Sequence, residues 1–359
     1  MIGDREQHAL AMIERVRAKP ATFKDAQITM AHGAGGKATR SLVEGLLVPA
    51  FESAALRDLD DAGTVTVDGL GMAVTTDTFV VTPIRFPGGS IGELAVNGTV
   101  NDLAMVGARP LALTLSLVLE EGLMADDLRT EVEAIASAAR TAGVEIVAGD
   151  TKVVERGRCD SMYVTTTGIG LVDSRADLSP SALRPGDRII VSGPIGEHGT
   201  AVMLARGEFE LDAAVESDTR SLWPAVDALL DAAGPSLRCL RDATRGGVAT
   251  VLNELARASA VAIVVQEANV PVRPAVAGAC EILGIDPMYV ANEGRFVTFV
   301  APQAAPEALA ALRSVPGCEE AIDIGEVKTD PPGMVLLATA FGGRRVMDTL
   351  VGDPLPRIC

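Results

Sequence analysis

Residues 91–119 read IGELAVNGTVNDLAMVGARPLALTLSLVL, and this stretch carries the pattern that decides the fold. We expect a helix over about 91–106, which leads through Ala108-Arg109-Pro110 into a strand over 111–119. Thr114 and Ser116 interrupt the strand, so it is far shorter than the roughly 20 apolar residues of a membrane span. A helix followed directly by a buried strand is typical of a layered fold.

The flanking sequence repeats this alternation. Residues 126–142 are amphipathic, with Leu128, Val132, Ile135 and Ala139 on one stripe, which predicts a second helix. The expected strands on either side cover residues 64–67, 73–76, 79–82, 144–148 and 162–169. Strands that alternate with helices predict a mixed α/β (α+β) fold and argue against an all-helical one.

A polar segment at 173–187, with Pro180, Pro185 and Gly186, predicts a domain boundary. The second half again alternates helical patterns with β runs. Two prolines near the C-terminal end predict an extended tail. We therefore expect an N-terminal extension with a helix at 1–26, a first domain at 27–172, a second domain at 173–344 and a flexible tail at 345–359.

The charge balance excludes some partners. The 359 residues include 31 basic and 48 acidic ones, a formal net charge of −17. Such a chain repels nucleic-acid phosphates and anionic lipids, so we expect neither nucleic acid nor a membrane as partner. A bound nucleotide should arrive with Mg²⁺. Five cysteines without CxxC spacing predict a reducing cytoplasm, and three histidines make a histidine-built metal centre improbable.

A glycine loop, His32-Gly33-Ala34-Gly35-Gly36-Lys37, precedes a helix expected over about 41–51. Glycines let backbone N–H groups approach an anion, so Gly33, Gly35, Gly36 and Lys37 are candidate phosphate ligands. The loop is not a GxxxxGK[ST] motif. A flexible turn before a helix explains it equally well.

Several acidic residues lie beside β runs or glycine-rich turns. Mg²⁺ prefers hard oxygen ligands, a few carboxylates together with substrate phosphates. Each single residue is explained as well by a turn or a helix cap, whereas the number of them favours a site. Asn97 and Asn101 are four apart and share a helix face. The candidate metal ligands are Asp61, Asp77, Asp102, Asp150 and Asp242.

Four further residues are candidates for chemistry. Lys152 would neutralise phosphate charge, and Glu293 or His198 would transfer protons, although each is also explained as an ordinary loop or helix-start residue. Cys359 has no core to fill on an extended tail, in contrast to the other cysteines, which fit buried positions. The adjacent terminal carboxylate should raise its thiol pKa.

Together these segments resemble the HypE family of hydrogenase maturation factors, in the PurM-like (aminoimidazole ribonucleotide synthetase) superfamily. The resemblance covers about residues 27–359, on the motifs 32–40, 76–77, 96–102, 107–110, 148–153, 192–199, 241–248, 292–295 and 356–359. It implies a PurM-like two-domain fold. The N-terminal domain would pair with its copy through a shared β-barrel in a homodimer, and ATP would lie between the domains.

The resemblance also implies a reaction. A carbamoyltransferase, HypF, would place a carbamoyl group on Cys359, and this chain would use ATP to dehydrate the S-carboxamide to a thiocyanate. The cyano group would pass to iron held by a HypC–HypD complex, for a [NiFe] hydrogenase. The five aspartates would hold Mg²⁺ and phosphates, and Asn97 and Asn101 would contact ATP. The glycine loop and Lys37 would cover the phosphates, Lys152 would stabilise the transferring phosphoryl group, and Glu293, ahead of His198, would move protons.

Two alternatives stay open. Within the superfamily, a selenophosphate synthetase would need a reactive cysteine in the glycine loop, which has none, and a thiamine monophosphate kinase would not need Cys359. Outside enzymes, the chain would be a carrier that presents Cys359 to partners. The carrier predicts a stable carboxamide in the presence of Mg-ATP.

Overall fold

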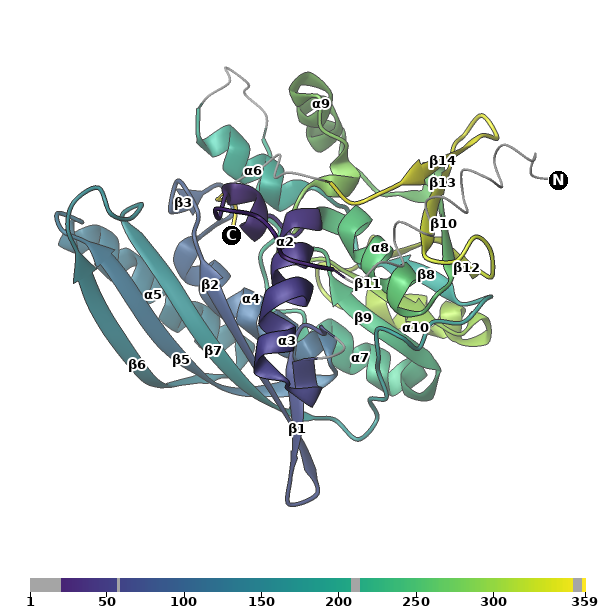
Figure 1. Cartoon of the computed structure of the whole chain (residues 1–359), viewed down its shortest axis with the longest axis horizontal. Coiled ribbons are helices and arrows are strands. Elements are labelled where there is room, and N and C mark those ends of the chain that lie inside the picture. The colour runs from purple at the N-terminus through teal and green to yellow at the C-terminus, as the bar shows by residue number, and fades with distance from the viewer. Residues whose placement is uncertain (1–20, 57–58, 208–213, 351–356) are drawn as a thin grey trace.

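Two β-sheets covered by helices make up the described part of this chain (Figure 1). The computed structural model describes residues 21–56, 59–207, 214–350 and 357–359. The N-terminal helix expected within 1–26 falls almost wholly outside these residues, as do residues 351–356 of the expected tail. No helix in the described ranges is long and apolar enough to cross a membrane.

The first sheet has five strands in the order β1-β2-β7-β5-β6, antiparallel except for the parallel pair β5 and β6. The strand expected at 73–76 lies within one longer strand, Leu70–Phe79, whereas the separate strand expected at 79–82 is wrong, because residues 80–82 lie outside it. The expected strand at 144–148 extends to Val154. The strands are β1 (Gly63–Val67), β2 (Leu70–Phe79), β5 (Ala108–Glu120), β6 (Glu145–Val154) and β7 (Met162–Val172).

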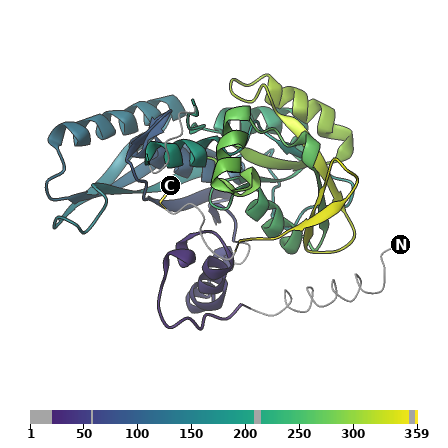
Figure 2. The same cartoon turned by 90° about the horizontal axis from the view of Figure 1, so that it is seen from above.

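Helices α4 (Ile91–Met105) and α5 (Ala125–Ala142) cover one face of this sheet (Figure 2). Ile135 of α5 and Val100 of α4 pack against Leu113 of β5 in one buried cluster. Gly168 of β7 allows α4 to come close, because a Cβ there would lie 2.8 Å from Cγ2 of Thr99. Strand β5, which lies between these two helices in the sequence, is thus the strand that residues 91–119 predict.

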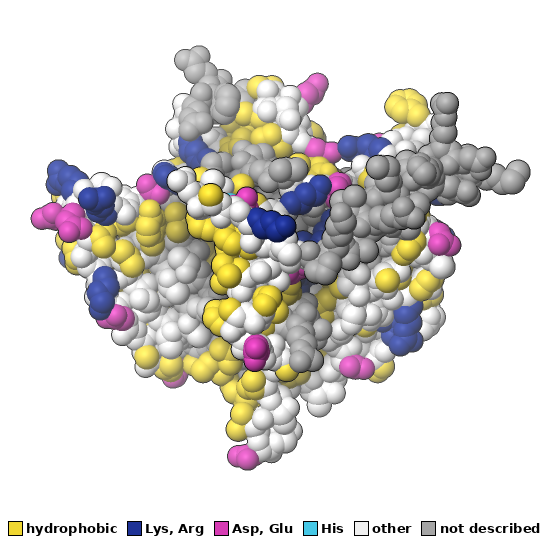
Figure 3. Space-filling model, in the orientation of Figure 1, with side chains coloured by type: hydrophobic (Ala, Val, Ile, Leu, Met, Phe, Trp, Pro, Cys, Tyr) yellow, Lys and Arg dark blue, Asp and Glu magenta, His cyan; other side chains and the backbone are white. Residues whose placement is uncertain are grey.

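The opposite face of the sheet carries exposed hydrophobic side chains, shown in yellow along the strands in Figure 3. Val65, Leu70, Val74 and Ile169 are each at least one third exposed. The small hairpin β3 (Arg85–Phe86) and β4 (Gly89–Ser90) forms a separate sheet. Over the described residues the five strands form an open sheet with β1 and β6 at its edges, so the chain by itself closes no barrel.

The second sheet has seven strands in the order β14-β13-β10-β12-β8-β11-β9. Phe296 and Phe299 of β11 are fully buried on opposite faces, in two different core clusters. The strands are β8 (Arg188–Val191), β9 (Leu237–Asp242), β10 (Ala262–Gln266), β11 (Phe296–Val300), β12 (Ile322–Lys328), β13 (Met334–Ala338) and β14 (Arg344–Met347).

Helix α8 covers one face of this sheet, and α7 and α10 cover the other. Helices α6 and α9 pack together beside the sheet with a smaller cluster of their own. The helices are α6 (Glu197–Ala205), α7 (Trp223–Ala233), α8 (Gly247–Ala258), α9 (Pro274–Leu283) and α10 (Ala305–Arg313). The polar segment 173–187 lies between the end of β7 and the start of β8.

Helix α4 also joins the two sheets, since Ala104 and Met105 pack in the same cluster as α7 and α10. Its Asn101 side chain donates to the carbonyl oxygens of Arg220 and Glu293 and accepts from the N–H of Leu222. Because every polar group of a buried side chain needs a partner, these bonds fix where α4 meets the second sheet.

The N-terminal segment forms a bent helix below both sheets in Figure 2. It comprises α2 (Lys37–Leu42), a π-helical turn η2 (Val43–Leu47) and α3 (Val48–Phe51). The helix begins at Lys37, four residues before the expected start at residue 41. Pro49 has no N–H to donate along the helix, which accounts for the irregular turn before it.

Candidate functional site

A cavity of about 200 Å³ lies where the two sheets meet, and its lining residues come from segments far apart in the sequence. Asp77 comes from β2 of the first sheet, and Asp102 comes from α4, which covers that sheet. Asp242 ends β9, and Glu293 precedes β11 of the second sheet. The lining residues are Asp61, Asp77, Thr78, Phe79, Gly98, Asp102, Asp242, Thr244, Arg245, Glu293 and Cys359.

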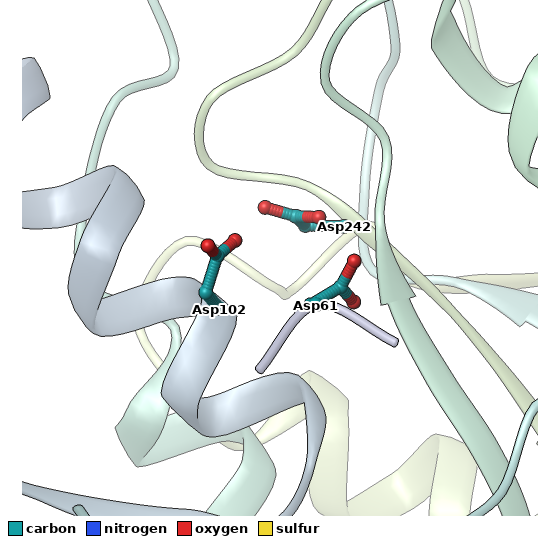
Figure 4. A group of neighbouring side chains, drawn as sticks. All are labelled: Asp61, Asp102 and Asp242. Carbon is teal, nitrogen blue, oxygen red and sulfur yellow. The ribbon is translucent and has the colours of Figure 1, made fainter. Parts of the chain in front are cut away.

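Three of the predicted metal ligands meet here (Figure 4). One carboxylate oxygen from each of Asp61, Asp102 and Asp242 lies within 4.8 Å of the others. Oδ2 of Asp61 is buried and has no hydrogen-bond partner among the described residues. Buried carboxylates with an unused oxygen fit Mg²⁺, which takes hard oxygen ligands. Asp77 lines the same cavity and hydrogen-bonds Asp102.

Burial and mutual repulsion dominate the electrostatics of this cluster. Burial raises the pKa of Asp61 and of Asp102 well above the ordinary value, and neighbouring carboxylates raise both pKa values further. Burial likewise raises the pKa of Asp242 to about 7, against the attraction of Arg241. Arg241 also pairs with Asp61 at 3.0 Å. The cluster is therefore unfavourable in its ionised form unless a cation compensates it.

This electrostatic imbalance predicts a pH-dependent response to Mg²⁺. The folded pKa of Asp242 lies above its unfolded value of 3.8, so the group costs nothing below about pH 4 and destabilises the metal-free fold as pH rises through about 7. We expect Tm in EDTA to fall between pH 5.5 and 8. Saturating Mg²⁺ should raise Tm by about 5 °C at pH 8 and less at pH 5.5, measured by calorimetry.

Two variants control this measurement. Asp102→Asn should abolish most of the Mg²⁺ response, whereas Asp126→Asn, which removes an exposed carboxylate of α5 away from the cavity, should leave it intact. An equal Mg²⁺ shift in wild type and Asp102→Asn contradicts the assignment of the metal ligands.

Cys359 and Glu293 meet at one end of the cavity. The Cys359 and Glu293 side chains line the same cavity, and Glu293 is 3% exposed, with its Oε1 atom buried and without a hydrogen-bond partner among the described residues. Burial, followed by the charge of Asp242, raises the pKa of Glu293 well above its usual value. Burial, followed by the charge of Glu293, raises the pKa of the Cys359 thiol. The pKa of the thiol is raised, as predicted, but the leading causes are burial and Glu293 and not the terminal carboxylate.

Arg245 is a site residue that the sequence reasoning did not single out. Its guanidinium donates to the carbonyl oxygen of Gly33 at 2.8 Å, and the charges of Cys359, Asp77 and Glu293 raise its pKa. Gly35, at φ +75°, packs on it so closely that a Cβ would lie 3.0 Å from the Arg245 carbonyl oxygen. The sequence feature that could have identified Arg245 is its position three residues after the candidate metal ligand Asp242.

The glycine loop therefore lies beside the cavity without lining it. Lys37 points elsewhere, since its Nζ pairs with Asp348 at 3.0 Å and the side chain is about half exposed. A Cβ on Gly36 would collide with the Leu350 carbonyl oxygen at 2.6 Å. The loop thus contacts Arg245 on one side and Leu350, at the start of the tail, on the other. Its phosphate-covering role stays a prediction.

Asn97 and Asn101, for which a contact with ATP is predicted, both bond to residues of the second half of the chain. Asn97 donates to Thr219 Oγ1 at 3.2 Å, and Asn101 makes the three bonds described above. Both side chains face the second domain and are buried. The two residues lie on one helix as predicted, and these hydrogen bonds join α4 to the second half of the chain. The contact with ATP stays a prediction.

Asp150 and Lys152 lie outside the cavity. They form an exposed ion pair of 2.8 Å on edge strand β6, and the hydrogen bond from Lys152 lowers the pKa of Asp150. Within this chain Asp150 therefore lies apart from the other four predicted metal ligands, and its metal-binding role stays a prediction. Its neighbour Gly149 suggested a turn, whereas residues 145–154 form one strand whose register points both side chains to the open face.

His198 contacts the tail instead of the cavity. Its Nε2 bonds the carbonyl oxygen of Ile358 at 2.9 Å, and its Nδ1 bonds Ser217 Oγ at 2.8 Å. Burial lowers the pKa of His198, so the ring is neutral. With both nitrogens engaged, the ring has no free atom for the expected proton transfer.

Comparison with known proteins gives the family. The N-terminal domain model of the AIR synthase related proteins matches residues 59–172, and the C-terminal domain model matches residues 184–336. Carbamoyl dehydratase HypE of Cupriavidus necator is 48% identical over 342 residues, which cover 95% of this chain and 97% of that protein. Carbamoyl dehydratase HypE of Escherichia coli is 42% identical over 337 residues, covering 92% and 99%.

Solved structures of HypE proteins are also similar to this chain. A chain from a HypE–HypF complex superposes with a TM-score of 0.82 at 43% identity, covering 86% of this chain and 99% of that one. HypE in complex with ATP superposes with a TM-score of 0.78 at 44% identity, covering 93% and 100%. A thiamine monophosphate kinase from Aquifex aeolicus, at 17% identity and a TM-score of 0.61, shares the fold.

Proposed function

We propose, on the premise that this chain belongs to the HypE family of carbamoyl dehydratases among the AIR synthase related proteins, that it acts in hydrogenase maturation. It is an ATP-dependent dehydratase, and HypF is its partner. The substrate is an S-carboxamide on Cys359, the product is a thiocyanate, and a HypC–HypD complex takes the cyano group for iron. The unpaired cysteines fit a reducing cytoplasm.

One observation carries the assignment of the reaction to this site. The Cys359 side chain reaches Glu293 in the same small cavity as the carboxylates that fit Mg²⁺. A sulfur-bound carboxamide at this position would lie next to a buried carboxylate and close to a place for Mg-ATP. A passive carrier has no use for a buried acid against its cargo.

The chemical problem is the oxygen of the amide, which is a poor leaving group. Transfer of the γ-phosphoryl group from ATP to this oxygen, with loss of one nitrogen proton, gives an O-phosphoimidate and ADP. Cleavage of the C–O bond, with loss of the second nitrogen proton, gives the C≡N bond and phosphate. Overall the S-carboxamide and ATP yield thiocyanate, ADP and phosphate.

The chain's own residues fit this sequence. Glu293 is the proposed acceptor of the nitrogen protons, because its raised pKa makes its carboxylate a stronger base than an exposed one. Arg245 would balance negative charge beside the sulfur. Asp61, Asp77, Asp102 and Asp242 would hold Mg²⁺, which supplies charge compensation for the phosphates.

The mass of the C-terminal peptide tests this function. Full-length protein carbamoylated by HypF is incubated with ATP and Mg²⁺, digested and weighed. Loss of one water from the carbamoyl adduct on Cys359 is the expected result. A carboxamide that stays intact with Mg-ATP, while ATP binding is demonstrated, favours the carrier.

We also propose that two copies associate through the open face of the first sheet. That face exposes Val65, Leu70, Val74 and Ile169, and edge strand β6 has its backbone groups available for pairing. Such a dimer completes the expected barrel. It also offers Asp150 and Lys152 to the nucleotide site of the other copy, as the exposed ion pair is far from its own aspartate cluster.

Mixed dimers test this arrangement. Lys152→Ala and Glu293→Gln are each expected to lose most dehydratase activity alone, whereas an equal mixture of re-associated subunits should recover up to about a quarter of wild-type activity, because half of the dimers carry one intact site of two. The control mixes either variant with itself. Failure of the mixture, with subunit exchange shown by mass spectrometry, places Lys152 in the site of its own chain or outside any site.

A further inference from the structure

The last residues of the chain are held by a receptor made of an apolar pocket and three hydrogen-bond donors. Ile358 is 3% exposed and packs with Ala201 of α6, Val276 of α9 and Val290. The preceding residue, Arg357, is in contrast about half exposed and pairs with Asp160 at 3.2 Å. Burial of an aliphatic side chain of this size contributes substantially to the binding of a short peptide.

In the described part of the tail, the donors engage the backbone carbonyl groups of Arg357 and Ile358. The carbonyl of Arg357 accepts from the N–H of Thr82 at 3.2 Å and from the guanidinium of Arg206 at 2.8 Å. The carbonyl of Ile358 accepts from His198. A carbonyl can only accept, so Nε2 of His198 carries the proton and Nδ1 accepts from Ser217.

These contacts set the position of the sulfur. The Ile358 side chain and carbonyl are fixed on one side of the tail, so the next residue, Cys359, is directed to Glu293. Arg206 also bonds the carbonyl of Thr82, which ties the donors together. Phe86 packs edge-on against the His198 ring with centroids 5.3 Å apart and holds it in plane.

We propose that this receptor recognises its substrate by the penultimate Ile358 and by two backbone carbonyls, with His198 as a positioning residue. The proposal rests on the proposed function for the identity of the reaction, but the docking itself does not depend on it. The receptor requires an aliphatic residue before the reacting cysteine and tolerates change at Arg357. It therefore also binds a separate peptide of the same ending.

Alkylation of Cys359 measures docking without ATP or a carbamoyl group. The full chain is treated with iodoacetamide, and the modified C-terminal peptide is quantified over time. Ile358→Ala should speed modification about 30-fold, the change expected for losing most of a buried isoleucine. Arg357→Ala should speed it less than about threefold, because its ion pair is exposed. The matched control Ile282→Ala removes an exposed isoleucine of α9 and should change nothing.

His198 is tested by rescue. His198→Phe keeps a ring but removes the donor, and it should speed alkylation about tenfold. His198→Gln restores an N–H donor and should return most of the protection. If His198→Gln is as unprotected as His198→Phe while both melt like wild type, the hydrogen bond to Ile358 has no positioning role.

A peptide supplied in trans tests the recognition. The probe is fluorescein-labelled Leu-Pro-Arg-Ile-Ser, and the protein is full-length Ile358→Asp, whose own tail should leave the pocket. We expect saturable binding by anisotropy, and at least tenfold weaker binding for the same peptide with alanine in place of isoleucine. Equal binding of both peptides, or equal alkylation of Ile358→Ala and wild type, overturns the proposal. Neither readout involves dehydration, so a failure here is separable from a failure of the proposed function.

Discussion

Cys359→Ser is expected to abolish formation of the cyano group completely. The carbamoyl group needs a nucleophile that HypF can load, and the later release of cyanide to iron needs a C–S bond; a serine hydroxyl, with a pKa far above that of a thiol, provides neither. The structure predicts that the fold survives, because Cys359 lies at the cavity surface and not in a core cluster. Intact mass after HypF treatment, and hydrogenase activity in cells, measure the loss.

The control for this variant is Cys318→Ser, a buried cysteine outside the cavity. It should accept a carbamoyl group and dehydrate it at the wild-type rate, with a small loss of stability. ATP binding by Cys359→Ser, measured by calorimetry, should equal that of wild type. Mature hydrogenase from cells that carry only Cys359→Ser contradicts the central assignment.

Glu293→Gln is expected to slow dehydration of pre-carbamoylated protein by about 100- to 10,000-fold, the usual contribution of a positioned general base. Glutamine has the same size and keeps the backbone bonds of residue 293, including that from its N–H to Asp218 at 3.1 Å. It cannot accept a proton. The variant also removes one negative charge next to Asp242, so metal-free stability should rise at pH 8.

The measurement is single-turnover conversion of the carboxamide to thiocyanate by mass spectrometry, with Mg-ATP in excess. Carbamoylation by HypF should be unchanged, because it takes place on the tail. Glu319→Gln, which removes an exposed carboxylate, is the matched control. Dehydration by Glu293→Gln at the wild-type rate would mean that another group, or water, accepts the protons.

The sequence predicted the layers of the fold because local patterns report local structure. The helix and strand in residues 91–119, the amphipathic helix that follows and the strand at 162–169 all appear, as periodicity depends only on neighbours in the chain. It failed where a strand carries glycine and polar residues. The strand expected at 144–148 continues to residue 154 as β6, because pairing with β5 outweighs local propensity.

The sequence by itself determined which groups are candidates for the site: acidic residues beside turns, a glycine loop and a cysteine on an extended tail. These features follow from residue type and short-range order. Only the tertiary structure decided which of them meet. Asp61, Asp102 and Asp242 converge because strand order and the packing of α4 bring distant segments to one point, while the register of β6 turns Asp150 away. His198 contacts the tail and does not line the cavity that contains Glu293. Distances between residues remote in sequence are set by packing, which no local pattern encodes.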